Sequence, residues 1–416
     1  MSHQYTIFDE DDELNLGAPV EAPEDIQNAW RKAKQHLKQN FTVLQEMDYE
    51  AKLYRQDGIA HSFLIECQKM GKNCHVSVGG LDSIVLYIWL KSIGIDVPGI
   101  TVSSLEDKGN QRVHKALGLE MVKSYKTKTQ VLQECGFPVI SKRIAGKINL
   151  LQNPTEQNKT VRHAIITGEC GAQGHFAKNS RMQLPDKWLK LFGGYENENE
   201  GVGYRKPDFK VSNDCCYWLK EKPCDDWAKE HNSYPYLGLM ASEGGQREEA
   251  LIEHGCNYYG RGTVRSAPFA IFMRNDILRL ALEMDKWYHD HLDIFEELYY
   301  KQPYSEGTKY EPVESIIPTA YGEIKQKENG DYYTTRAQRT GCSMCGFGIH
   351  LEERPHRFDI LREDNPKEWD FYMNKCCTDE NGNKYGWGKV LDYIGVGWRD
   401  VPAKQITIDE YLKGIT

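Results

Sequence analysis

A short apolar stretch that ends in two glycines is the part of the sequence best suited to chemistry. Residues 75–83 read HVSVGGLDS, and a helical run over 84–90 follows. Gly79 and Gly80 let backbone amides approach a ligand without interference from a Cβ. The helix behind them aims its N–H groups and its positive end at the same point. The pattern predicts an anion site, phosphate above all; the alternative is a tight strand-to-helix turn capped by Asp82.

Paired cysteines are the second feature that could do chemistry. Cys342 and Cys345 form a Cys-x-x-Cys knuckle between glycines, and Cys215 and Cys216 are the close pair upstream, with Cys224 nearby. A Cys-x-x-Cys is shared by zinc sites, iron–sulfur sites and redox pairs of the thioredoxin type. Flanking glycines are unsuited to the helix start that the thioredoxin type requires, so a metal–thiolate site is favoured.

The adjacency of Cys215 and Cys216 guides the choice of metal. Neighbouring side chains diverge, and both could bind one tetrahedral zinc only with strain, whereas the iron atoms of a cluster are separated. Amides freed by the glycines beside Cys342 and Cys345 would moderate the thiolate charge. We therefore favour a [4Fe–4S] cluster on these four cysteines, with zinc as the alternative.

Composition and charge narrow the class of protein. The 416 residues are 40% hydrophobic and 27% charged, as in ordinary globular proteins. A formal net charge of −9 disfavours broad binding to nucleic acid. No apolar run is long enough for a membrane span, and the N-terminal MSHQYTIFDEDDELNLG does not resemble a signal peptide. With twelve cysteines that do not form a disulfide framework, these features predict a cytoplasmic protein.

Alternating strand and helix signals would position the glycine loop. After the helix that ends near Ser92, strands are expected over 99–103 and near 120–124, with helices around 111–117 and over 130–134. This alternation implies an α/β fold with a doubly wound, mostly parallel sheet. Ligands of such sheets bind at the carboxyl ends of the strands.

Other polar residues fall at expected strand ends. Ser104 follows the second strand, where it would line the same ligand site as the glycine loop. A returning strand over 236–241 leads to Glu243 and Arg247, two candidate ligand-binding residues at its end, and Arg247 would contact a phosphate or sulfate. The alternatives are a surface turn for Ser104 and a helix-face arginine for Arg247.

Three regions are expected along the chain. Residues 1–72 form an acidic lead-in and helices, and residues 73–300 form the α/β domain that carries the glycine loop. An insertion over about 138–210 interrupts that domain, with no clear secondary structure. Residues 301–416 form a C-terminal region that carries the cysteine knuckle.

The glycine loop resembles the pyrophosphate-binding loop (PP-loop) of the adenine nucleotide α-hydrolase superfamily, Ser-Gly-Gly-x-Asp-Ser. Gly79, Gly80, Asp82 and Ser83 match the pattern. A valine, with Ser77 before it, stands where the pattern has its first serine. The resemblance implies a fold of the HUP/PP-loop type, which binds ATP on these residues.

The cysteine segments resemble a second signature. Residues 215–223, CCYWLKEKP, together with 342–345, CSMC, are similar to the split Cys-Cys … Cys-x-x-Cys of assimilatory adenylyl-sulfate reductases. The chain is thereby identified as a member of the phosphoadenosine phosphosulfate (PAPS) reductase family in the broad sense, which includes sulfurtransferases of DNA phosphorothioation. The resemblance implies a [4Fe–4S] cluster beside the nucleotide and Lys220 close to that cluster. The tail, 406–416, lacks the cysteine nucleophile of the reductases.

These resemblances imply an ATP-dependent enzyme of sulfur metabolism. ATP would bind at Gly79 to Ser83 with Mg²⁺ near Asp82, and an adenylated acceptor would then receive sulfur, with Asp82, Ser83 and Lys220 as catalytic residues. The acceptor, a nucleic acid, a tRNA base or a metabolite, stays open, as does the oligomeric state. A sulfur donor protein would be a partner, and Cys376 or Cys377 is either a carrier thiol or structural.

Two alternative functions stay open. One is a sulfonucleotide reductase, which would bind adenylyl sulfate or its 3′-phosphate and release sulfite with a thiol reductant protein. The other is a non-catalytic module that binds adenine nucleotide and carries a structural metal.

Overall fold

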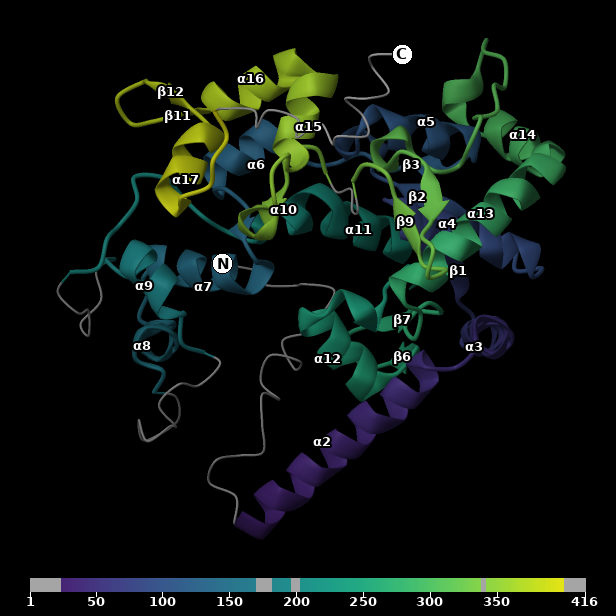
Figure 1. The fold of residues 1–416 in the computed structure, drawn as a ribbon, viewed down its shortest axis with the longest axis horizontal. Coiled ribbons are helices and arrows are strands. Elements are labelled where there is room, and N and C mark those ends of the chain that lie inside the picture. The colour runs from purple at the N-terminus through teal and green to yellow at the C-terminus, as the bar shows by residue number, and fades with distance from the viewer. Residues whose placement is uncertain (1–23, 170–181, 196–202, 338–341, 400–416) are drawn as a thin grey trace. The chain divides into compact units, whose positions relative to one another are not determined.

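The computed structural model describes residues 24–169, 182–195, 203–337 and 342–399, and they divide into two units. Unit 1 consists of Met1–Tyr125 and Tyr217–Ser343, and unit 2 of Lys126–Cys216 and Met344–Thr416 (Figure 1). Each unit has its own hydrophobic core. The acidic lead-in over 1–22 and the tail over 406–416 lie outside the described residues.

Unit 1 is built on a mostly parallel sheet of six strands in the order β3-β2-β1-β5-β7-β6. The strands are β1 (Asn73–Ser77), β2 (Gly99–Thr101), β3 (Glu120–Met121), β5 (Ser233–Tyr236), β6 (Asn257–Tyr259) and β7 (Val264–Ser266). The strand pairs are parallel except for β6 with β7. The expected α/β class with a mostly parallel sheet is confirmed.

The strand order reverses at β1. The chain passes from β1 to β2 and then β3 on one side, and it later adds β5 and β7 on the other side. Such a reversal opens a crevice outside the carboxyl ends of the two strands that flank it. The glycine loop leaves β1 at this end, between β2 and β5.

Helices surround the sheet of unit 1. They are α2 (Glu24–Gln45), α3 (Tyr49–Lys69), α4 (Leu81–Ser92), α5 (Lys108–Ala116), α11 (Lys222–Glu230), α12 (Gly245–His254), α13 (Arg274–Asp290) and α14 (Leu292–Tyr300). The long α2 packs against α12 (Figure 1). A hairpin of β8 (Ile324–Gln326) and β9 (Tyr332–Thr334) contacts α13, as the Asn-Gly turn at 329–330 predicts.

Helix α4 is the central helix of unit 1. Its residues from Ile84 to Leu90 are all buried, because it packs against β1 and α13. At 12 residues it is too short to cross a bilayer. Across the described ranges, no helix combines the length and the apolar character of a membrane span.

The returning strand differs from its prediction. The sequence predicts a strand over 236–241, whereas β5 ends at Tyr236 and includes Pro235. Proline argues against a strand assignment because it lacks a donor. Here Leu237 N donates to Ser266 O of β7. Successive residues of a strand point their backbone nitrogens to alternate sides, so the nitrogen of Pro235, two residues earlier, also faces β7. Because the ladder with β7 begins only at Tyr236, Pro235 costs no hydrogen bond.

Unit 2 is mainly helical in its described residues, and the region expected as an insertion, about 138–210, falls within it. Its helices are α6 (Lys128–Glu134), α7 (Lys142–Gln152), α8 (Lys159–Thr167), α9 (Asp186–Phe192), α10 (Asp214–Cys216), α15 (Arg357–Asp364), α16 (Pro366–Asn374) and α17 (Trp387–Ile394). Its short strands are β4 (Val139–Ile140), β10 (Gly346–Phe347), β11 (Cys377–Thr378) and β12 (Lys384–Tyr385). Two distant parts of the chain thus form one core.

A buried ion pair joins α3 to α13 in unit 1, and its loss should destabilise the fold. Lys52 Nζ lies 2.7 Å from Asp276 Oδ2, with side-chain exposures of 4% and 12%. Lys52→Met leaves the carboxylate without a cation in an apolar setting, and we expect a loss of about 3–5 kcal/mol in the free energy of unfolding, measured in urea. Lys69→Met breaks an exposed pair with Glu66 and should cost less than about 1 kcal/mol. Equal losses for the two variants would contradict this prediction.

Candidate functional site

The glycine loop links β1 to α4 at the carboxyl end of the central strand. Gly80 caps α4 with φ −84° and ψ −170°, and Gly79 is not among the glycines with positive φ. Any residue can adopt these backbone angles. Glycine is therefore useful here because it has no Cβ and leaves room beside the loop, not because of its conformational freedom. A Cβ on Gly79 would lie 3.6 Å from Glu106 Oε1 and 3.9 Å from Lys220 Nζ. The open side of the loop therefore faces a charged pair.

Hydroxyl groups occupy acceptor positions on the loop. Gly79 N donates to Ser83 Oγ at 2.8 Å, and that hydroxyl donates to Gly80 O at 2.9 Å. Leu81 N donates to Tyr321 OH at 3.3 Å. Hydroxyl oxygens accept hydrogen bonds as phosphate oxygens do. The loop amides therefore already point at oxygen atoms that a ligand could replace.

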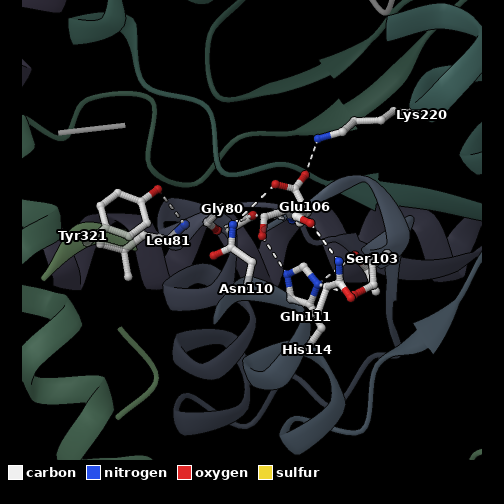
Figure 2. A network of polar contacts seen from close by, with 12 residues as sticks. Gly80, Leu81, Ser103, Glu106, Asn110, Gln111, His114, Lys220 and Tyr321 are labelled. Carbon is white, nitrogen blue, oxygen red and sulfur yellow. Dashed lines mark hydrogen bonds and ion pairs between the residues drawn. The ribbon is translucent and has the colours of Figure 1, made fainter. Parts of the chain in front are cut away.

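A buried histidine fixes the loop from the side of α5 (Figure 2). His114 Nε2 lies 2.7 Å from Gly79 O, and its Nδ1 lies 3.0 Å from Ser103 Oγ. Burial lowers the pKa of His114 below its usual value, so the ring is neutral near pH 7. Because a carbonyl can only accept, the proton is on Nε2 and the serine hydroxyl donates to Nδ1. The neutral ring thus positions the Gly79 carbonyl.

A carboxylate and an ammonium pair beside the loop (Figure 2). Glu106 follows η1 (Ser103–Leu105) after β2, and Lys220 lies on a π-helical segment, η2 (Tyr217–Glu221). The Glu106 side chain is 2% exposed and that of Lys220 is 32% exposed. Asn110 Nδ2 lies 3.4 Å from Glu106 Oε2, and Gln111 Nε2 donates to Glu106 O at 2.8 Å. π-Helical turns are frequent at functional sites.

The predicted magnesium ligand also has a cationic partner. Arg274 Nη1, from the first residue of α13, donates to Asp82 Oδ1 at 2.6 Å. The same guanidinium lies over the ring of Tyr321, 5.9 Å from its centroid. A cation at Asp82 would therefore share this carboxylate with Arg274.

The remaining predicted ligand residues lie in separate settings. Ser77 is the half-buried last residue of β1, and Ser104 is exposed within η1. Glu243, from η3 (Ala241–Glu243), bonds to Arg247 in the first turn of α12. A phosphate at Arg247 would compete with that carboxylate.

Four residues around the loop have roles that the sequence patterns do not predict. His114 falls inside an expected helix, Glu106 ends an expected turn, and Arg274 and Tyr321 lie far along the chain. The sequence does carry one local indication for His114. A polar residue on the buried, apolar face of a helix needs a hydrogen-bond partner. The partner itself, the Gly79 carbonyl, is a matter of tertiary structure.

The cysteine segments of unit 2 both pair with one short stretch of backbone, residues 137–140. The backbone of Phe137 pairs with 210–212, just before Cys215 and Cys216 in α10. Two residues later, β4 pairs in parallel with β10, which begins directly after Cys345. Backbone pairing of both segments with 137–140 thus brings distant parts of the chain to the same stretch of backbone.

The predicted ligand set is divided between the units. Cys342 belongs to unit 1, and Cys215, Cys216 and Cys345 belong to unit 2. The knuckle turns through Met344, whose φ of 62° is uncommon for a residue other than glycine. In the described part of the chain, no group of three His, Cys, Asp or Glu side chains has the arrangement of a formed metal site.

The Cys376–Cys377 pair is buried in unit 2. The exposures of the two residues are 4% and 1%, and their sulfur atoms lie 3.9 Å apart. Cys376 Sγ also lies 3.2 Å from Tyr372 O. Such burial is typical of cysteines that serve in packing.

Comparison with known proteins gives no relative from which a function could be transferred. No protein-family model, curated protein or solved structure matches this chain. The residues and geometry described above are therefore the basis for a functional proposal.

Proposed function

We propose that this chain is an ATP pyrophosphatase of the PP-loop type, with a doubly wound HUP-like domain, that adenylates an acceptor for sulfur transfer. The observation that carries the proposal is the position of the GGLDS loop at the carboxyl end of β1, where the strand order reverses between β2 and β5. In open parallel sheets this is the place where ligands bind. The family resemblance of the loop and cysteine motifs supports the same assignment.

The loop supplies the binding chemistry for phosphates. The β- and γ-phosphates of ATP would replace the hydroxyls of Ser83 and Tyr321 as acceptors for the loop amides. The N-terminus of α4 favours negative charge at the same point, and Lys220 lies beside it. Mg²⁺ at Asp82 would neutralise further phosphate charge. Catalysis would then consist mainly of positioning and charge neutralisation.

The proposed reaction has two steps. An acceptor oxygen forms a bond to the α-phosphorus of ATP, the bond from that phosphorus to the bridging oxygen breaks, and pyrophosphate leaves. A sulfur nucleophile from a donor protein then bonds to the atom that carries the adenylated oxygen, and AMP departs with that oxygen and its electron pair. Lys220 and the amides of the loop would stabilise the negative charge that develops on pyrophosphate.

The cysteine set fits a [4Fe–4S] cluster in its donor chemistry. Soft thiolates select iron–sulfur clusters, and backbone pairing to 137–140 supports the segments of Cys215, Cys216 and Cys345. Cys342 would complete the set. When bound, such a cluster would hold or deliver the sulfur to be transferred.

Substitution of the first loop glycine tests the phosphate site directly. Gly79→Ala should fold normally, because its Cβ would have only ordinary contacts and its φ is unstrained. The added methyl would obstruct the approach of phosphate, and we expect ATP affinity to fall by roughly tenfold or more. Calorimetry with ATP and thermal unfolding would measure both effects.

The matched control for this substitution is Gly58→Ala in α3, because no atom lies within 4 Å of its Cβ position. Unchanged ATP affinity in a folded Gly79→Ala protein would place the nucleotide elsewhere. Conversion of ATP to AMP and pyrophosphate by the wild type supports the pyrophosphatase. Release of sulfite from adenylyl sulfate without ATP turnover would instead identify a reductase.

A further inference from the structure

A buried carboxylate lies beside the proposed anion site. The Glu106 side chain is 2% exposed, and its Oε1 lies 3.6 Å from the Cβ position of Gly79. A negative group in the loop would therefore approach a second negative group that water cannot screen. Like charges at such separations oppose each other's ionisation or binding.

A cation and a side-chain amide contact the Glu106 carboxylate. Lys220 contacts it from η2, and Asn110 contacts it from α5. His114, also on α5, is neutral because burial lowers its pKa. The neighbouring carboxylate of Asp107 is turned to the start of α5, where it accepts from Gly109 N and Asn110 N. An anion in the loop would thus add a negative charge beside the Glu106–Lys220 pair.

The Lys220 side chain is more exposed than that of Glu106. Its side chain is one-third exposed, and its Nζ lies 3.9 Å from the Cβ position of Gly79. An ammonium has three donors on a flexible stem and can exchange acceptors without moving its backbone. A phosphate at the glycine loop would therefore be within reach of the same cation that neutralises Glu106.

We propose that Lys220 exchanges partners on ligand binding, and that Glu106 is the positioning residue that sets how strongly an anion must compete for it. This inference rests on the proposed function and states which anions the same site would select. Anions with several charges, such as the β- and γ-phosphates of ATP, overcome the competition, and weakly charged anions do not. After the reaction, the return of Lys220 to Glu106 favours departure of pyrophosphate, the most highly charged product.

Removal of the Glu106 charge should strengthen anion binding. Glu106→Gln keeps the shape of the side chain and a carbonyl acceptor for Asn110 and Lys220 but removes the competing anion. We expect affinity for inorganic pyrophosphate, measured by calorimetry without Mg²⁺, to rise by roughly tenfold or more. Glu106→Asp keeps the charge and should stay within about threefold of the wild type. A structural role alone would weaken binding rather than strengthen it.

Two further variants sharpen the test. Asp96→Asn removes a carboxylate that pairs with Lys91 at 2.6 Å beyond the C-terminal end of α4, and it should leave pyrophosphate affinity unchanged. Lys220→Gln should weaken pyrophosphate binding by about tenfold. Thermal unfolding of each variant shows that it is folded.

The outcomes separate this inference from the proposed function. If folded Glu106→Gln binds pyrophosphate as the wild type does, or more weakly, with or without Mg²⁺, partner exchange is wrong while the nucleotide site stands. If Lys220→Gln binds like the wild type, the exchange is equally excluded. If the wild type and Glu106→Gln both bind neither ATP nor pyrophosphate, the proposed function fails and this inference fails with it.

Discussion

Replacement of Cys345 by serine is expected to remove bound iron from the protein. Purified without oxygen, the wild type should contain about four iron and four sulfide per chain, with the broad visible absorption of a cluster. Serine offers a hard, protonated hydroxyl where the cluster requires a thiolate. We expect the variant to retain less than about one iron per chain. Cys345 directly precedes β10, whose pairing with β4 fixes the knuckle from one side, so the fold of unit 2 should survive.

Cys135→Ser is the matched control for this substitution. Cys135 lies in the same unit, just before Phe137, and burial raises the pKa of its thiol above the usual value. A protonated thiol is a poor metal ligand, so this variant should keep its full iron content. Iron and acid-labile sulfide assays, with the absorption spectrum, measure both proteins. Stoichiometric zinc in a colourless wild type would contradict the cluster and favour the structural metal.

Local patterns predict the first part of the sheet because its signals are contiguous. An apolar run, two glycines and a second apolar run specify β1, the loop and α4 within 20 residues of sequence. The next strand and helix follow with equally short connections. The prediction placed β5 too far along the chain, because the cost of Pro235 depends on whether a neighbouring strand needs a hydrogen-bond donor at that position. Only the three-dimensional structure shows that β7 is the strand beside β5.

The partners of the loop could not be predicted from sequence because they come from long-range contacts. Glu106 and Lys220 are 114 residues apart, and Arg274 and Asp82 are 192 residues apart. No periodicity or motif within one segment specifies which charges meet at such separations. The sequence predicts an anion site at the loop, and tertiary packing determines which carboxylates and cations surround it.

The division of the chain into two units also results from contacts between residues that are distant in sequence. The sequence predicts an insertion over about 138–210, and the structure joins 126–216 to the segment after Ser343 in one core. The clearest link is the stretch 137–140, whose strand β4 has only two residues and is too short to recognise from alternation. Residues 210–212 pair with Phe137, and β10 pairs with β4. A two-residue strand has no sequence signal of its own.

A side chain at Gly238 is expected to eliminate nucleotide binding by displacing the loop. Gly238 lies two residues after β5, and its Cβ position is 2.9 Å from Ser83 N and 3.0 Å from Asp82 C. Both atoms belong to the backbone of the first turn of α4, so no side-chain rotation can relieve the clash. Gly238→Val must therefore push α4 and β5 apart.

We expect Gly238→Val to lower the free energy of unfolding by about 2 kcal/mol or more and to weaken ATP binding by at least roughly tenfold. Urea denaturation and calorimetry with ATP measure these effects, and Gly58→Val, where a Cβ meets no neighbour, shows the cost of valine in an open site. The contrast with Gly79→Ala is informative, because that substitution should impair binding alone. If Gly238→Val bound ATP normally, the first turn of α4 would not be the phosphate site, since the turn cannot keep its position beside β5 once a side chain stands between them.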